Sequence, residues 1–427
     1  MTLLHASGGP DAVLGDDAIA SALLEAIGAL GAHERIAIVP PDFTRRHSRA
    51  GLLTDAVCER YGDRVADVLP ALGTHAPMTV DEIREMYPGV PLDRFREHRW
   101  RDDVVDVGEV PADFVAQATE GIWRKPWPVQ MNRLLWEGGH DLLLSIGQVV
   151  PHEVMGMANY NKNIFIGTGG SLSINESHFI GAAYGMERMM GRADTPLRRI
   201  LNRAQDAFCA HLPLVYALTV IGSDDRGELV TRGFFVGDDH ECFERAAELS
   251  VLVNVTRLPA ALDKVVVSLP ADEFKTTWLG NKAIYRTRMA LADEAELIVL
   301  APGVAGFGED AEIDRLIRRY GYRTTPEIMA AMADNADLQA NLSAAAHLIH
   351  GSSEGRFRVT YAPGRLSRAD IEGVGYGFGD LEALSQRYHP RAGRTGWQTT
   401  AEGEDYFYID NPALGLWAAT ERLSRAR

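Results

Sequence analysis

The pattern of hydrophobic and polar positions predicts an α/β arrangement in the first hundred residues. Residues 16–31 carry apolar side chains at helical spacing and begin with two aspartates, which suit the positive end of a helix dipole. A short apolar run at 35–40 predicts a buried strand, and a helix is expected near 50–61. A second strand, at 66–73, precedes a helix that Thr79 should cap, because a glutamate follows three residues later.

The same alternation returns after a less regular middle section. Residues 102–150 look richer in strands, and a domain boundary is expected near 256–263. Beyond it, strands and helices alternate as in a doubly wound, Rossmann-like sheet. We therefore predict two α/β domains, an N-terminal one at 1–260 and a C-terminal one at 261–400. The apolar spacing also predicts a last amphipathic helix at about 411–427, able to pack back on the N-terminal domain.

Composition narrows the class of protein. The chain has 427 residues, of which 46% are hydrophobic, so large cores can form. A formal net charge of −16 argues against a nucleic-acid partner, whose phosphates require a basic surface. No apolar run reaches the roughly 20 residues of a membrane span, and the N-terminus lacks the pattern of a signal peptide. Three scattered cysteines fit reduced thiols, so a cytoplasmic protein with no membrane partner is expected.

Polar residues with chemical potential follow two of the predicted strands. Asp42 and Arg45 come just after the strand at 35–40, and His75 comes just after the strand at 66–73. In α/β folds the loops beyond strand ends commonly contact ligands. These residues are therefore candidates for a binding or catalytic site.

A second concentration of polar residues runs from 147 to 181. His152 follows an apolar run, Lys162 lies in an NYNKN loop and His178 follows a glycine-rich turn. Each histidine alone could be a hydrogen-bonded structural residue. Several in such settings favour a site, because imidazole is the usual base near neutral pH and a common metal ligand. Lys162 is either an exposed loop lysine or, if crowded, an amine that loses its proton and becomes a nucleophile.

Other candidates have simpler interpretations. Five histidines at turns or helix ends are expected to be solvated: His5, His33, His47, His98 and His211. His347 and His350 share one helix face without a third metal ligand nearby, so a packed or surface pair is expected. The GTGG turn at 167–170 could hold an anion on backbone N–H groups, although its spacing matches neither a Walker loop nor a dinucleotide fingerprint. Lys282, in a helix expected at 277–292, is either a surface lysine or a partner for a substrate carboxylate.

Taken together, the motifs resemble those of the nickel-pincer lactate racemase family, the nickel-dependent 2-hydroxyacid racemases and epimerases. In chain order they are DFTR from Asp42, LGTHAPMT from Leu72, PHEVMG…K…IGTGG…SINESH from Pro151 to His178, and the helix of Lys282. The resemblance spans roughly residues 35–310. DxTR or GTH alone would be weak signals, but the ordered set is fairly specific.

The resemblance implies a cofactor, a metal and a role for each matching residue. The cofactor is a pyridinium-3,5-bisthiocarboxylate mononucleotide that binds nickel, the nickel-pincer nucleotide. By position, Lys162 would be its covalent tether, His178 would bind the nickel, and His75 and His152 would be the acid/base pair. The residues expected to contact the cofactor are Asp42, Phe43, Thr44 and Arg45. Lys282 would bind the substrate carboxylate.

The implied chemistry explains why two histidines are needed. The hydrogen at C2 of a 2-hydroxy acid leaves as hydride, which avoids a dianion, while a histidine takes the hydroxyl proton. A base on each side serves the two enantiomers. Arg45 would polarise the developing carbonyl. The family further implies that the N-terminal domain carries the cofactor site, that the C-terminal domain closes over the substrate, and that the active site lies in the cleft between them.

Three departures from the family pattern bear on the cofactor and the substrate. Ala158–Asn161 replace a small SGG-type segment before the tether lysine, and Ala76 stands where arginine is frequent. Trp278 and Leu279 replace the Tyr-Gln pair expected of a lactate enzyme. Losing a cation and an amide donor predicts a substrate other than lactate, either a bulkier 2-hydroxy acid or a sugar acid.

Two other classes of function remain open. The histidines could serve a zinc-dependent hydrolase or lyase, although no carboxylate lies at helical spacing from them. The chain could also be a non-enzymatic two-domain binder of organic acids, which leaves the histidines unexplained. For the leading interpretation the expected partners are a small 2-hydroxy acid, the proteins that assemble the cofactor and, as a homo-oligomer, further copies of the chain.

Overall fold

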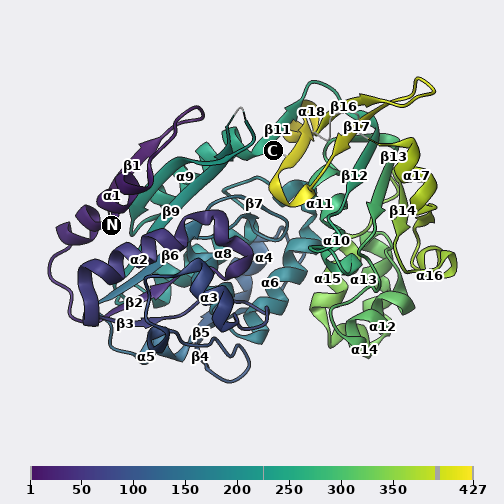
Figure 1. Cartoon of the computed structure of the whole chain (residues 1–427). Coiled ribbons are helices and arrows are strands. Elements are labelled where there is room, and N and C mark those ends of the chain that lie inside the picture. The colour runs from purple at the N-terminus through teal and green to yellow at the C-terminus, as the bar shows by residue number, and fades with distance from the viewer. Residues whose placement is uncertain (1, 225, 390–394, 426–427) are drawn as a thin grey trace. The chain divides into compact units, whose positions relative to one another are not determined.

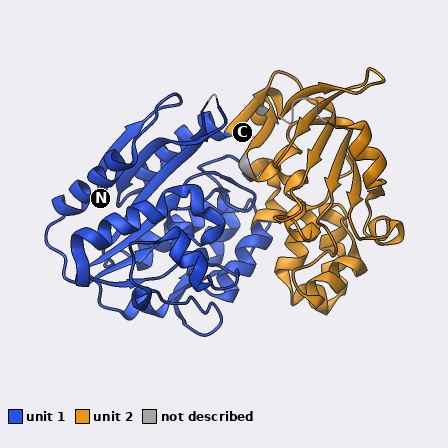
Figure 2. Ribbon diagram, viewed as in Figure 1, with its two compact units in different colours: residues 1–180, 189–254 blue, residues 181–188, 255–427 orange. Residues whose placement is uncertain are grey.

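The computed structural model describes residues 2–224, 226–389 and 395–425 (Figure 1). The chain folds into two compact units (Figure 2). Unit 1 comprises residues 1–180 and 189–254, and unit 2 comprises residues 181–188 and 255–427. The change from one unit to the other at 254/255 lies close to the expected boundary near 256–263, while the short segment 181–188 groups with the C-terminal part.

The centre of unit 1 is a six-stranded sheet. Its strands, in spatial order, are β1 (Leu3–Gly8), β10 (Leu229–Gly237), β9 (Leu214–Ser223), β6 (Leu142–Gln148), β2 (Ile36–Val39) and β3 (Val65–Val68). Strands β9, β6, β2 and β3 run parallel, whereas β10 and β1 add antiparallel. The chain passes from β2 to β3 on one side and then to β6 on the other. The carboxyl ends of β2 and β6 therefore form a topological switch point, the usual place for ligand binding in such sheets.

Helices and small sheets complete unit 1. The helices are α1 (Asp16–Ala29), α2 (Ala50–Tyr61), α3 (Val80–Met86), α4 (Ala112–Ala118), α5 (Arg133–Glu137), α6 (Ser171–Tyr184), α7 (Met186–Met189), α8 (Pro196–Phe208) and α9 (His240–Asn254). Strands β4 (Val104–Val110) and β5 (Trp127–Asn132) form one hairpin, and β7 (Pro151–His152) and β8 (Gly156–Met157) form another. The last turn of α6 and most of α7 fall in the segment that groups with unit 2.

The core of unit 1 explains why these segments fold as they do. Leu23 of α1 and Leu53 of α2 are fully buried against Ile38 of β2 and Leu144 of β6. Each such side chain stabilises the fold by about 1.5–3 kcal/mol on leaving water. The predicted capping box is confirmed at α3, where Thr79 and Glu82 satisfy each other's backbone N–H groups.

Unit 2 contains a second six-stranded sheet. Its strands, in spatial order, are β15 (Gly377–Phe378), β14 (Arg358–Pro363), β13 (Leu291–Ala301), β12 (Leu262–Ser268), β17 (Asp405–Ile409) and β16 (Gly396–Thr399). All neighbours are parallel except β16. The strand order reverses beside β12, as in a doubly wound sheet. The mixed α/β class with parallel sheets is thus confirmed.

The helices of unit 2 connect these parallel strands. They are α10 (Thr277–Gly280), α11 (Lys282–Thr287), α12 (Ala311–Tyr320), α13 (Thr325–Asp334), α14 (Ala336–Gln339), α15 (Leu342–His350), α16 (Arg368–Gly373), α17 (Leu381–Arg387) and α18 (Thr420–Arg425). No helix in the described ranges is long and apolar enough to cross a membrane.

Two predicted helices need correction. A single helix at 411–427 is wrong: β18 (Leu416–Ala419) pairs in parallel with β11 (Val255–Leu258), and only α18 follows it. All four residues of β18 are buried, so their apolar spacing reflects an enclosed strand rather than an amphipathic helix. Residues 426–427 lie outside the described ranges. The helix expected at 277–292 is two short helices, α10 and α11, because the chain already turns into β13 at Leu291.

Candidate active site

Asp42 and His75 form a close pair at the carboxyl edge of the unit 1 sheet. Asp42 follows β2, His75 follows β3, and Asp42 Oδ2 lies 2.6 Å from His75 Nδ1. Because a carboxylate accepts, Nδ1 carries the proton and Nε2 of the neutral ring keeps its lone pair. Burial alone would raise the pKa of Asp42, but the hydrogen bonds from His75 and Thr44 and the nearby Arg45 hold that pKa below its usual value. Asp42 thus fixes the orientation of the His75 ring and leaves the Nε2 lone pair able to accept a proton.

The three residues after Asp42 take different positions. The Thr44 backbone N–H and hydroxyl both donate to Asp42 Oδ1, so Thr44 supports the carboxylate. The Phe43 ring packs against the core of unit 1 and under the Arg46 guanidinium, 5.2 Å from it. Within the described residues, the Arg45 guanidinium forms no hydrogen bond or ion pair. Of this group, Arg45 is the cation available to an anionic ligand.

His152 lies on the short hairpin that follows β6. It occupies strand β7, and its Nδ1 accepts a hydrogen bond of 3.1 Å from the Val154 backbone N–H. That bond assigns the proton of a neutral ring to Nε2. The neighbouring Glu153 carboxylate raises the pKa of both Lys162 and His178, so it lies within electrostatic range of the two.

Lys162 is partly buried at the start of a π-helical turn, Asn163–Gly167. Burial, with a smaller effect of Arg45, lowers the pKa of Lys162 to about 8. About a tenth of the amine is then neutral at pH 7, far more than for an ordinary lysine. This is the state in which an amine attacks an activated carbonyl or thiocarbonyl carbon.

His178 lies on α6 and has one ring nitrogen committed. Its Nδ1 is 2.7 Å from the Ile174 carbonyl oxygen, which can only accept, so Nδ1 carries the proton. Burial lowers the pKa of His178, and Lys162 and His75 lower it further, so the ring is neutral near pH 7. A histidine that donates one N–H to a carbonyl presents its other nitrogen as a metal ligand.

The turn before α6 is built by close packing rather than as an anion site. A side chain on Gly169 would lie 1.9 Å from the Phe165 carbonyl oxygen, and one on Gly170 would lie 2.3 Å from Gln130 Oε1. That Gln130 oxygen accepts from the backbone N–H groups of Leu172 and Ser173. The first N–H groups of α6 are therefore already used, which argues against the anion-binding interpretation of the GTGG turn.

The NYN segment before Lys162 has an unusual backbone. Asn159 and Tyr160 have φ values of 65° and 59°, both in the left-handed region. That conformation costs roughly 1–2 kcal/mol per residue with a side chain, although asparagine tolerates it better than most. Glycines would adopt it without strain, which fits the small residues that the family resemblance leads one to expect here.

The predicted substrate residues lie on two short helices of unit 2. Trp278 is on α10, where its indole stacks on the His347 imidazole with ring centroids 4.3 Å apart. Leu279 is partly buried beside it. Lys282 is the first residue of α11, and its Nζ lies 5.7 Å from the Phe274 ring centroid.

His347 itself is a packed structural histidine. Its Nδ1 lies 2.9 Å from the Tyr285 hydroxyl and its Nε2 lies 3.0 Å from the Tyr322 hydroxyl. It is 4% exposed, and burial lowers its pKa to about 3. His350 is 5% exposed. Both rings are buried, so of the two expectations, a packed or a surface pair, the packed pair is confirmed.

Some histidine predictions were wrong. His33 and His98 are buried rather than solvated. His98 Nε2 donates to the Gly169 carbonyl and its Nδ1 accepts from Asn132, so both nitrogens are used beside the glycine-rich turn. His47 is partly buried and hydrogen-bonded to Gln148, and burial lowers its pKa to about 4. Polar sequence surroundings did not reveal that tertiary packing encloses these rings.

Unit 1 therefore brings together most of the predicted site. Asp42, Arg45, His75, Lys162 and His178 form one group whose members lie within electrostatic range of one another. Two members were not predicted from sequence: Glu153, which adjoins His152, and Arg198 of α8, which acts on Lys162 across 36 positions of sequence. Only the position of Glu153 next to a candidate base could have suggested it. No sequence signal marks Arg198.

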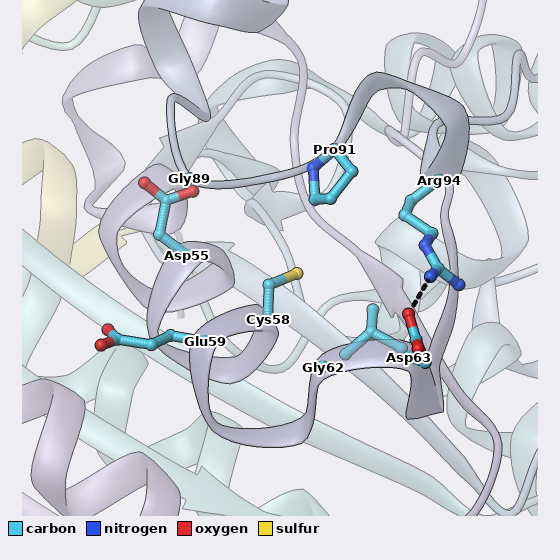
Figure 3. Close-up of a pocket in the computed structure, with 9 residues that line it drawn as sticks. Asp55, Cys58, Glu59, Gly62, Asp63, Gly89, Pro91 and Arg94 are labelled. Carbon is cyan, nitrogen blue, oxygen red and sulfur yellow. Dashed lines mark hydrogen bonds and ion pairs between the residues drawn. The ribbon is translucent and has the colours of Figure 1, made fainter.

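A surface pocket elsewhere in unit 1 does not belong to this group. It has a volume of about 500 Å³ and is lined by residues of α2 and the loops near β3, including Asp55, Cys58 and Arg94 (Figure 3). Burial raises the pKa of the Cys58 thiol to about 11, so this thiol is not an activated nucleophile. Figure 3 shows Arg94 paired with Asp63 at the side of the pocket.

The donor set also bears on the zinc alternative. Across the residues with described positions, no group of three or more His, Cys, Asp or Glu side chains is placed to hold a metal ion. Catalytic zinc usually takes three protein ligands. A metal bound by a single histidine would take its other donors from water, substrate or a cofactor.

Three comparisons with known proteins show what the chain resembles. Residues 16–189 match the family model described as the lactate racemase N-terminal domain. No curated protein matches the chain. Among solved structures, a Thermotoga maritima protein is 22% identical, with a TM-score of 0.80 over 97% of this chain and 100% of its own.

The lactate racemase apoprotein of Thermoanaerobacterium thermosaccharolyticum is 16% identical, with a TM-score of 0.71 over 96% of this chain and 94% of its own. At these identities the two structures establish a shared fold. The match over residues 16–189 covers the segments that supply Asp42, His75, His152, Lys162 and His178. Residues 16–189 are thus similar to the lactate racemase N-terminal domain, and the whole chain shares its fold with the two solved structures.

Proposed function

We propose that the protein is a nickel-pincer nucleotide-dependent racemase or epimerase of a 2-hydroxy acid. One observation carries the proposal: unit 1 holds a lysine whose pKa is lowered to about 8 and, within electrostatic range, a neutral histidine with one nitrogen blocked by a carbonyl. The first suits a covalent tether and the second suits a metal ligand. The match of residues 16–189 to the lactate racemase N-terminal domain supports the reaction class.

The residues present fit the nickel-pincer nucleotide. Lys162 would tether it, His178 Nε2 would complete the coordination of its nickel, and Arg45 would face an anionic group of the mononucleotide. When bound, the group supplies a reversible hydride acceptor for C2 of the substrate. Thr44 contributes by holding Asp42, and Phe43 by packing the loop onto the core.

The protein's own residues would then move the hydroxyl proton. His75, whose Nδ1 is held by Asp42, can take that proton at Nε2 and return it. His152, whose Nδ1 accepts from Val154, is the proposed second base for the opposite enantiomer. Arg45 would stabilise negative charge on the substrate oxygen.

The substrate assignment rests on unit 2. We propose that Lys282 holds the substrate carboxylate and that Trp278 and Leu279 shape the pocket for a bulkier 2-hydroxy acid or a sugar acid. The stacking of Trp278 on His347 fixes the indole as a flat apolar wall, which suits the face of a ring or a long side chain better than a methyl group. Proteins that assemble the cofactor are proposed partners, the cytoplasm is the proposed compartment, and a homo-oligomer is the proposed assembly.

The test uses covalent attachment. The chain has five lysines: Lys125, Lys162, Lys264, Lys275 and Lys282. After co-expression with a cofactor-assembly system, intact-mass analysis should show one adduct, and peptide mapping should place it on Lys162. Lys162→Ala should lose both the adduct and racemisation, whereas Lys125→Ala, which changes an exposed lysine, should keep both. Full activity of loaded Lys162→Ala protein would contradict the tether.

The reaction is tested on the loaded enzyme. A panel of 2-hydroxy acids and aldonic acids in deuterated solvent should give isomer exchange with little deuterium at C2, since hydride returns internally. Complete exchange of C2 hydrogen with solvent would contradict hydride transfer.

A further inference from the structure

The segment that delivers Lys162 is held by an unusual set of buried interactions. Asn159 and Tyr160 take left-handed backbone conformations immediately before Asn161 and Lys162. Non-glycine residues in this conformation are strained, so the turn would relax unless other interactions held it. Two sets of interactions keep it in place, one around the Tyr160 ring and one around the backbone and amide oxygens of the segment.

The Tyr160 ring is enclosed on several sides. It is fully buried, stacks on Phe243 with centroids 5.2 Å apart, and lies 4.3 Å from the Tyr216 centroid. Its hydroxyl is 2.9 Å from His240 Nδ1 and accepts from Gln205 at 3.2 Å. Tyr160 therefore acts as an anchor that fixes one end of the turn to α8 and α9.

Arg198 of α8 holds the oxygens of the same turn. Its guanidinium donates to the Met157 carbonyl at 2.9 Å, to the Asn159 carbonyl at 3.3 Å and to Asn161 Oδ1. These acceptors lie before, within and after the left-handed pair. Asn161 in turn donates to Asn202, also on α8. The planar guanidinium spreads five N–H donors over three nitrogens and so spans these separated acceptors, whereas an ammonium group donates from a single nitrogen.

The charge of Arg198 is not neutralised by a carboxylate. The residue is 2% exposed, and none of the described residues forms a salt bridge with it. Its guanidinium lies 4.1 Å from the Phe243 ring centroid instead. A buried cation without a counter-ion is costly, so stability of the core alone is a poor reason for placing it there. Its hydrogen bonds all converge on the turn that leads to Lys162.

We propose that Arg198 is the positioning residue of this site: it locks the NYN turn and thereby holds the Lys162 amine in place for covalent attachment of the cofactor. The inference rests on the proposed function for the identity of the attached group. It explains how this chain carries bulky residues where the family resemblance leads one to expect small ones. The hydrogen bonds of Arg198 stabilise the left-handed backbone conformation that glycine would adopt without strain.

The test measures the Lys162 amine directly in cofactor-free protein. An amine-reactive acylating probe is applied at pH 8, and mass spectrometry follows its addition to Lys162 relative to exposed Lys125. Arg198→Met should slow acylation of Lys162 about tenfold, which corresponds to ~1.4 kcal/mol, without changing Lys125. Arg199→Met is the matched control, because Arg199 is the next residue on α8 and pairs with Asp194 at the surface.

Two further variants separate positioning from charge and from general stability. Arg198→Lys keeps the charge but loses the fork, so a positioning role predicts little recovery of the acylation rate. Adding Asn159→Gly to Arg198→Met removes the strain at one left-handed residue and should recover most of the rate. Full rescue by lysine, or equal rates in Arg198→Met and Arg199→Met, would overturn the proposal.

A milder change covers the case in which Arg198→Met fails to fold. Asn161→Ala removes one of the oxygens that accept hydrogen bonds from Arg198. It should slow acylation of Lys162 about threefold, or ~0.7 kcal/mol, without changing the thermal transition temperature. An unchanged rate there would also overturn the proposal. Because the probe replaces the cofactor, these results hold or fail apart from the adduct experiment, which tests the proposed function.

Discussion

His75 and His178 of unit 1 differ from His347 of unit 2 in how many ring nitrogens the protein uses. In unit 1, His75 and His178 each have Nδ1 bound, to Asp42 and to the Ile174 carbonyl, and no described residue bonds to Nε2 of either ring. In unit 2, His347 has both nitrogens bound to tyrosine hydroxyls. His98, buried in unit 1, resembles His347 in this respect.

That difference distinguishes His178 from His347, which burial does not. His178 and His347 are both kept neutral by burial, which lowers the pKa of each. Only His178 retains a nitrogen for a metal or proton. A histidine with both nitrogens bonded has none to offer, whereas one oriented through a single nitrogen can present the other to a metal or a proton.

The largest expected effect comes from His75. His75→Ala should lower kcat of the loaded enzyme by about 10²–10⁴-fold, the usual contribution of a general base. The side chain is 61% exposed and Asp42 keeps its hydrogen bonds from Thr44, so only a small decrease of the thermal transition temperature is expected. Steady-state kinetics and thermal unfolding of the same preparation check both parts. A variant that unfolds early but turns over normally would place His75 with the structural histidines.

The next effect concerns Lys162. Its pKa is lowered, so the neutral amine is populated at lower pH than in other lysines, and acylation should rise with pH and reach half its maximum near pH 8. At pH 7 the neutral fraction exceeds that of an ordinary lysine by about 200-fold. A pH series of labelling by mass spectrometry checks this. A midpoint near 10.4 would show that the amine is solvated as in a free side chain.

The smallest effect on turnover is expected at His347. His347→Leu removes one hydrogen bond from each of the Tyr285 and Tyr322 hydroxyls, at a cost of about 0.5–1.5 kcal/mol per bond, so chemical denaturation should show a less stable protein. The value of kcat should stay within about threefold of wild type, while KM rises because Trp278 loses its stacking partner. A hundredfold loss of kcat would show that His347 takes part in turnover and would contradict its distinction from His75 and His178.

Much of the fold follows from local patterns. The apolar run at 35–40 is the buried strand β2, and helical spacing predicted α1 and α2. Strand β1 was missed because its sequence, LLHASG, is short and mixed, and it is specified by pairing with β10 more than 220 residues later. Strand β18 was read as a helix because full burial removes the alternation that marks a half-exposed strand.

The site was predictable as a set of residue types but not as a network. Strand ends and the family resemblance pointed to Asp42, His75, Lys162 and His178. The pairing of Asp42 with His75 depends on β2 and β3 being neighbours, which periodicity does not reveal. Arg198 sits in an amphipathic helix like many other arginines, and only the fold shows that its side chain turns inward.

The burial of the cysteines has a practical consequence for measuring motion. Cys58, Cys209 and Cys242 are all buried, and burial raises the pKa of Cys58 to about 11, of Cys209 to about 12 and of Cys242 higher still. The native thiols are therefore unreactive towards maleimides near pH 7. Ser21→Cys on α1 and Ser385→Cys on α17 introduce one exposed thiol in each unit, and dyes would attach selectively to these two positions. Energy transfer between the two dyes would then report any change in their distance when substrate is added.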